Sequence, residues 1–190
     1  MRHIPKLPDV AHTGQILRNP VTGQDLVFRR TTADTGGEVL EVESVWRSGS
    51  TEPVEHYHPA QEERFEVTAG MLAARVGGEK HMLSPGDNLV VPAGTPHSMW
   101  NVSDGETRAV WETRPALKTE RFFETAWGLA EAGKVNKSGV PEPLQLAVLM
   151  REYDGEFRLT KPPRAIQRAV FGLLAPIGRL LGRRGYRPPS

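Results

Sequence analysis

The stretch HYHPAQEERFEVTAG, residues 56–70, decides the fold prediction. Its second half alternates polar and apolar residues, as a half-buried strand does, with Phe65 and Val67 on the apolar face. Glu63 shares that face, because residues two apart in a strand point to the same side. An ionised carboxylate on a core face is costly unless a cation or several donors satisfy it. The stretch therefore predicts a strand that carries a buried, partnered carboxylate.

Two histidines precede this strand. His56 and His58 are two residues apart, so in an extended chain they also point to one side. Pro59 then interrupts the ladder and permits a turn before the next strand begins. Neutral imidazoles cannot balance a carboxylate charge, whereas a divalent metal ion can. We therefore expect both histidines and Glu63 to bind a metal ion. Glu62, predicted to face solvent, is the alternative carboxylate.

A second stretch, GDNLVVPAGTPHSMWN, residues 86–101, supplies a further ligand. NLVV predicts a buried strand and PAGTP a turn, after which His97 opens a strand with Met99 on the same face. His97 is thus expected to point inward. Three histidines and one glutamate leave open positions on a five- or six-coordinate ion. Since the chain has no cysteine, we expect one divalent ion of Fe, Mn, Ni, Co, Cu or Zn per chain.

The remaining sequence divides into two parts with different residue patterns. Up to residue 115, short alternating or apolar runs such as EVLEVESVW and TRAVWET are separated by Gly and Pro turns, which predicts a β-sandwich or barrel. After residue 115, three segments at 117–133, 141–153 and 162–184 have helical patterns bordered by Gly or Pro. We predict a β-barrel domain over 1–115 and a helical C-terminal extension over 116–190.

Charge is unevenly distributed along the chain. Residues 161–190 hold seven of the 24 Lys and Arg residues and no Asp or Glu, so the rest is acidic. A basic face across the folded domain is absent, and we expect no nucleic-acid partner. The last helical segment is amphipathic, which permits contact with an anionic membrane. We favour packing on the barrel or on a second subunit, and expect a homodimer. Residues 1–15 lack the apolar run of a signal peptide, which predicts a cytoplasmic protein.

At these residues the sequence resembles the cupin superfamily. The first family motif, G(X)5HXH(X)3,4E(X)6G, is matched by Gly49, His56, His58, Glu63 and Gly70, with six residues instead of five after the first glycine. The second, G(X)5PXG(X)2H(X)3N, is matched by Gly86, Pro92, Gly94, His97 and Asn101. The resemblance implies a double-stranded β-helix, or jelly-roll barrel. It also implies a metal site with four ligands, His56, His58, Glu63 and His97.

The resemblance leaves the reaction open, because cupins include enzymes, sensors and storage proteins. We favour a mononuclear-metal oxidoreductase of the dioxygenase type acting on a small organic molecule. The alternative is a non-enzymatic or sensory cupin in which the metal only anchors a small ligand. Trp46, Met99 and Trp111 are expected either to line a ligand cavity or to fill the core. Asn101 is interpreted as structural, and Glu112 with Arg114 either as residues of the barrel exit or as a surface ion pair.

Overall fold

A computed structural model describes residues 11–50 and 52–186, and it is built on two antiparallel sheets. The first sheet contains β1 (Ile16–Asn19), β2 (Gln24–Arg30), β3 (Leu40–Trp46), β10 (Thr107–Arg114), β5 (Glu62–Ala69) and β8 (Asn88–Val91), in that order. The second contains β11 (Arg158–Leu159), β4 (His56–Tyr57), β9 (His97–Asn101), β6 (Leu72–Val76) and β7 (Glu79–Leu83). A short helix, α1 (Thr32–Thr35), follows β2.

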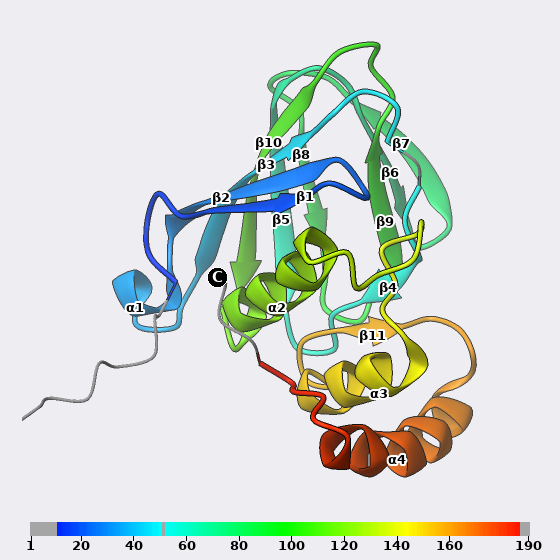
Figure 1. Cartoon of the computed structure of the whole chain (residues 1–190). Coiled ribbons are helices and arrows are strands. Elements are labelled where there is room, and N and C mark those ends of the chain that lie inside the picture. The colour runs from blue at the N-terminus through cyan, green and yellow to red at the C-terminus, as the bar shows by residue number, and fades with distance from the viewer. Residues whose placement is uncertain (1–10, 51, 187–190) are drawn as a thin grey trace, which may run out of the picture.

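The two sheets face each other and enclose the core of the barrel (Figure 1). Consecutive strands pair within a sheet or cross to the other sheet, as in a jelly roll. The inward positions are apolar and buried: Leu26, Phe28, Val42, Phe65, Val67, Leu72, Ala74, Val91 and Ala109. The predicted fold class, a mainly β jelly-roll barrel with C-terminal helices, is confirmed.

Strand β5 alternates as its sequence predicts. Its odd-numbered positions 63, 65 and 67 are buried, whereas 64, 66 and 68 are exposed. Strand β8 differs from its prediction, since NLVV was expected to be buried and only Val91 is. Val90 is 46% exposed. The reason is that the outer face of this antiparallel sheet meets solvent at β8, as it does at β5, so Asn88 and Val90 are exposed.

A glycine fixes the turn that connects β5 of the first sheet to β6 of the second sheet. Gly70 has a φ of 73°, in the left-handed region that favours glycine. A Cβ at this position would lie 2.5 Å from Thr107 Oγ1 and 2.8 Å from Thr107 Cα. The close approach of β10 therefore leaves no room for a side chain, which explains the glycine that ends the first motif.

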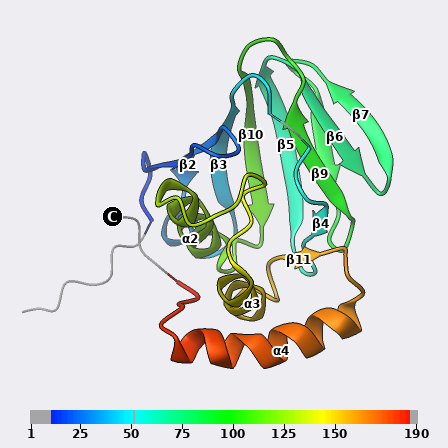
Figure 2. The ribbon, with the colours of Figure 1, turned by 45° about the vertical axis from the view of Figure 1, so that its right-hand side comes forward.

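The extension forms the three predicted helices, α2 (Thr119–Glu131), α3 (Pro143–Glu152) and α4 (Arg164–Leu180). Helix α2 lies against β1, and α3 lies below the end of the barrel that contains β4 (Figures 1 and 2). Between α3 and α4, strand β11 pairs with β4, so that Leu159 is the partner of His56. The extension thus adds a strand to the sheet that carries the histidines.

Helix α4 packs on the side of α3 that faces away from the barrel (Figure 2). Phe171, Ala175 and Gly178 are buried there, and a Cβ on Gly178 would lie 2.8 Å from Leu144 O. Packing against α3, and not against the barrel, therefore buries one edge of the apolar face of α4. Among the described residues, no helix is both long and apolar enough to cross a membrane.

Candidate metal centre

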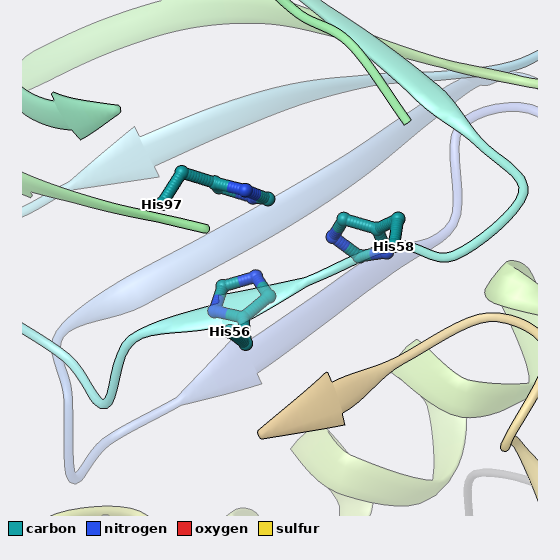
Figure 3. Close-up of side chains that lie close together, drawn as sticks. All are labelled: His56, His58 and His97. Atoms are coloured by element: carbon teal, nitrogen blue, oxygen red, sulfur yellow. The ribbon is translucent and has the colours of Figure 1, made fainter. Parts of the chain in front are cut away.

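Three histidines from two neighbouring strands come together at one end of the barrel (Figure 3). His56 on β4 is the ladder partner of His97 on β9, and His58 follows β4 directly. One ring nitrogen from each imidazole lies within 4.8 Å of the other two. His58 and His97 are buried and His56 is partly buried. A group of this kind could hold a metal ion.

The backbone fixes the tautomer of all three rings. Each Nδ1 lies within hydrogen-bond distance of a backbone carbonyl: Val54 O at 3.2 Å from His56, Glu156 O at 2.6 Å from His58, and Thr95 O at 2.9 Å from His97. A carbonyl oxygen only accepts, so each Nδ1 carries the hydrogen and donates it. The Nε2 lone pairs are therefore free for a metal ion, the arrangement found in metal-ligating histidines.

Glu63 completes the group from the opposite sheet. Its side chain is fully buried, as the parity of β5 predicts. Oε1 accepts a hydrogen bond from Trp111 Nε1 at 3.1 Å, and the carboxylate lies 3.1 Å from His58 Nε2 and 2.9 Å from His97 Nε2. The four predicted ligands are thus brought together. That they bind a metal remains a prediction.

Two atoms of this group are buried without a hydrogen-bond partner, His58 Nε2 and Glu63 Oε2. His97 Nε2 lies near the second of these atoms, but not in hydrogen-bond geometry. Buried polar atoms are nearly always satisfied, and the acceptor His58 Nε2, 3.1 Å from Glu63 Oε1, repels that oxygen unless a cation lies between them. Nitrogen and oxygen donors without sulfur suit a divalent transition ion. The residues therefore fit the metal that the motifs imply.

Burial and mutual contacts shift the pKa values of Glu63 and the three histidines. Burial opposes ionisation of Glu63, but the imidazoles of His58 and His97 outweigh it and lower its pKa to about 2. Burial also lowers the pKa of His56, well below its ordinary value, and that of His58. For His97 burial is outweighed by the contact with Glu63, so its pKa is raised. Without a metal, the favoured state pairs a Glu63 carboxylate with a His97 imidazolium.

Other residues singled out in the sequence lie outside this group. The side chain of Glu62 is 36% exposed and pairs with Arg64 at 2.8 Å, away from the histidines. Asn101 is structural, as predicted, because its Nδ2 donates to the carbonyls of Trp46, Arg47 and Gly105. Of the two interpretations of Glu112 and Arg114, the ion pair is present, at 3.1 Å.

A cavity of about 270 Å³ opens next to the histidines. Trp46, Met99 and Trp111 line it, as the ligand-cavity interpretation predicts, and all three are also buried in the core. Its remaining wall comes largely from the extension, with Phe122, Phe123 and Trp127 on α2, Leu146, Leu149 and Met150 on α3, and Phe157 before β11. The cavity is therefore built jointly by the barrel and the helices.

Phe157 and the carbonyl of Glu156 are site residues that sequence reasoning missed. The Phe157 ring stacks on His56 with centroids 4.6 Å apart, and Glu156 O holds His58. These contacts span about a hundred residues of chain, so no local spacing indicates them. The aromatic run RFFETAW, residues 121–127, was the available signal, since its rings face the cavity from α2.

A barrel of two antiparallel sheets with an inward cluster of three histidines and one glutamate defines the class: a small jelly-roll protein with a candidate metal centre. Residues 43–112 match the Cupin domain family. The barrel part of the chain is therefore similar to cupin domains, and a helical C-terminal extension follows it.

Three relatives extend the comparison. An oxidoreductase of Arthrobotrys oligospora is 27% identical over 158 residues, 77% of this chain and 61% of that protein. Protein SchB of Streptomyces halstedii is 38% identical over 38% of this chain and 58% of its own length. Quercetin 2,3-dioxygenase of Bacillus subtilis is 35% identical over 48% of this chain and 26% of that enzyme. The chain therefore spans about three fifths of the first two relatives and a quarter of the third.

Proposed function

We propose that this protein is a metal-dependent oxidoreductase of the dioxygenase type that acts on a small organic molecule. The observation that carries the proposal is the cluster of His56, His58 and His97 at the wall of a cavity, with two unsatisfied buried atoms. Glu63 lies against two of these histidines, His58 and His97. The oxidoreductase and dioxygenase names of two relatives support the reaction class.

Each part of the site has a role in this proposal. The four side chains would hold one divalent ion, which would supply open coordination positions where a substrate oxygen and dioxygen meet. The three backbone carbonyls keep the imidazoles in the tautomer that a metal requires. Trp111 orients Glu63 through its indole N–H. The apolar wall of the cavity excludes water from the reacting groups.

The test is metal analysis of the purified protein, followed by oxygen-uptake measurements with quercetin, catechol and acetylacetone. We expect about one transition ion per chain and oxygen consumption with at least one of these compounds. A His58→Ala variant should lose both. A protein that binds metal and these compounds but consumes no oxygen would instead be the non-enzymatic ligand-binding cupin. A protein without transition metal would contradict the proposal.

A further inference from the structure

Unsatisfied polar atoms gather at the cavity. In the described part of the chain, five buried side-chain nitrogen or oxygen atoms have no hydrogen-bond partner: Thr22 Oγ1, Thr32 Oγ1, His58 Nε2, Gln61 Oε1 and Glu63 Oε2. Thr22, His58 and Glu63 line the cavity. Two of these belong to the candidate metal centre, whereas Thr22 lies on the turn between β1 and β2. A molecule in the cavity would thus meet polar groups at two separate positions.

The wall between these positions is apolar and rich in aromatic rings. The aromatic lining residues are Trp46, Phe65, Trp111, Phe122, Phe123, Trp127 and Phe157. The indole N–H groups of Trp111 and Trp127 already donate, to Glu63 and to Gln24 O. Among the described residues that line the cavity none is Lys or Arg. A phosphate or sulfate group would therefore find neither Lys nor Arg here, although these side chains are its usual partners.

The size of the cavity limits the occupant. A cavity of roughly 150 Å³ accommodates benzene. At about 270 Å³, this cavity has room for one or two fused rings. Aromatic walls favour a flat ring, because offset-stacked and edge-to-face contacts add to the burial of apolar area.

We propose that the substrate is an aromatic molecule of one or two rings without a charged phosphate or sulfate. One oxygen substituent faces the histidines, and a second hydrogen-bonding group faces Thr22. The part concerning the histidines rests on the proposed function. The parts concerning the aromatic body and Thr22 rest on the cavity alone.

Binding is tested by isothermal titration calorimetry on the full-length protein with its own metal content. The probes are 2,6-dihydroxynaphthalene, 2-naphthol and glucose 6-phosphate. We expect the dihydroxynaphthalene to bind once per chain, at least tenfold more tightly than glucose 6-phosphate. Equal or tighter binding of the sugar phosphate, or no binding of the naphthol compounds, would overturn the substrate class. Neither result depends on oxygen uptake, so failure of the reaction and failure of the substrate class are separable.

Thr22 is tested by removing its hydroxyl at nearly constant shape. Thr22→Val should weaken 2,6-dihydroxynaphthalene about three- to tenfold, the range of one neutral hydrogen bond, and leave 2-naphthol unchanged. Thr32→Val is the matched control, because Thr32 Oγ1 is also buried and unsatisfied but lies outside the cavity lining. Equal binding of 2,6-dihydroxynaphthalene by the Thr22 variant and wild type, or an equal loss in both variants, would refute the role of Thr22.

A second inference comes from the outer face of α4. Six large aliphatic residues on this face are between 42% and 87% exposed: Ile166, Val170, Leu173, Ile177, Leu180 and Leu181. We call them the α4 stripe. Three arginines of the same segment pair with acids of the α3 region: Arg164 with Asp154, Arg179 with Glu152 and Arg183 with Glu142. Much of the basic charge is therefore neutralised within the chain.

We infer that the α4 stripe binds the same stripe of a second copy. Six such side chains expose several hundred Å², so two stripes face to face approach the roughly 1,200 Å² at which specific interfaces begin. A stripe without charge can match itself across a two-fold axis. An anionic membrane fits less well, because it would require the arginines that α3 already holds.

The test combines analytical ultracentrifugation with vesicle sedimentation. Wild type should be a dimer, Leu173→Glu a folded monomer by circular dichroism, and Arg168→Glu, at an exposed position off the stripe, still a dimer. Vesicles of phosphatidylcholine and phosphatidylglycerol should not sediment the protein. A monomeric wild type, a dimer that survives Leu173→Glu, or salt-sensitive vesicle binding would each overturn the inference.

Discussion

Exchanging Glu63 for glutamine tests the core of the metal centre. In the metal-free protein the pKa of Glu63 is lowered from 4.5 to about 2, so its stabilisation is present above pH 4.5 and lost as the pH falls through about 2. The raised pKa of His97 stabilises below 6.5 and is lost as the pH rises through that raised pKa. At pH 5.5 both partners are charged. A shift of this size corresponds to about 3 kcal/mol, from which the amide recovers part, so we expect Glu63→Gln to lower the free energy of unfolding by about 1–3 kcal/mol.

Metal affinity should fall as well, because the carboxylate is the only negative group among the four predicted ligands. Loss of a residue that hydrogen-bonds to a metal ligand typically lowers metal affinity by about 10–100-fold. Loss of a ligand itself should therefore lower metal affinity by more than about tenfold. Urea denaturation of chelator-treated protein at pH 5.5 measures the first effect, and cobalt titration against a competing chelator at pH 7.5 measures the second.

Glu62→Gln is the matched control, one residue away on the solvent face. Glu62 pairs only with Arg64 in an exposed contact, so the change should shift stability by less than about 0.5 kcal/mol and leave metal affinity near wild type. The reasoning is refuted if Glu62→Gln weakens cobalt binding while Glu63→Gln does not.

Three further predictions concern the same architecture. His58→Ala should abolish most of the metal content measured by mass spectrometry, whereas His81→Ala on β7, outside the histidine group, should not; equal losses would remove His58 from the site. Gly70→Ala should lower the free energy of unfolding, measured by urea titration, by more than about 2 kcal/mol, because Gly70 has a positive φ and its Cβ would lie 2.5 Å from Thr107 Oγ1. Gly105→Ala is the control: Gly105 has open space around it, so this change should cost less than about 1 kcal/mol in the same titration. Metal affinity should fall more than tenfold between pH 7.5 and 5.5, since the imidazoles must lose their protons to bind and the raised pKa of His97 brings that competition close to neutral pH; a flat profile would argue against histidine ligands.

The sequence by itself determined the barrel, its candidate ligands and the presence of helices in the extension. The reason is that these features have a short period. Alternation along residues 62–69 placed Glu63 inward and Glu62 outward, which follows from the two-residue repeat of a strand. The grouping of His97 with His56 and His58 was implied by the resemblance of the two motifs to the cupin family, not by local periodicity.

Only the tertiary structure decided what surrounds those ligands. Phe157 stacks on His56, Glu156 O fixes the tautomer of His58, and α2 supplies an aromatic wall, although all three come from the extension. The structure also made β8 an edge strand and left the α4 stripe exposed. Such contacts join segments far apart in the chain, and their geometry depends on how helices and sheets pack against one another, which no local pattern encodes.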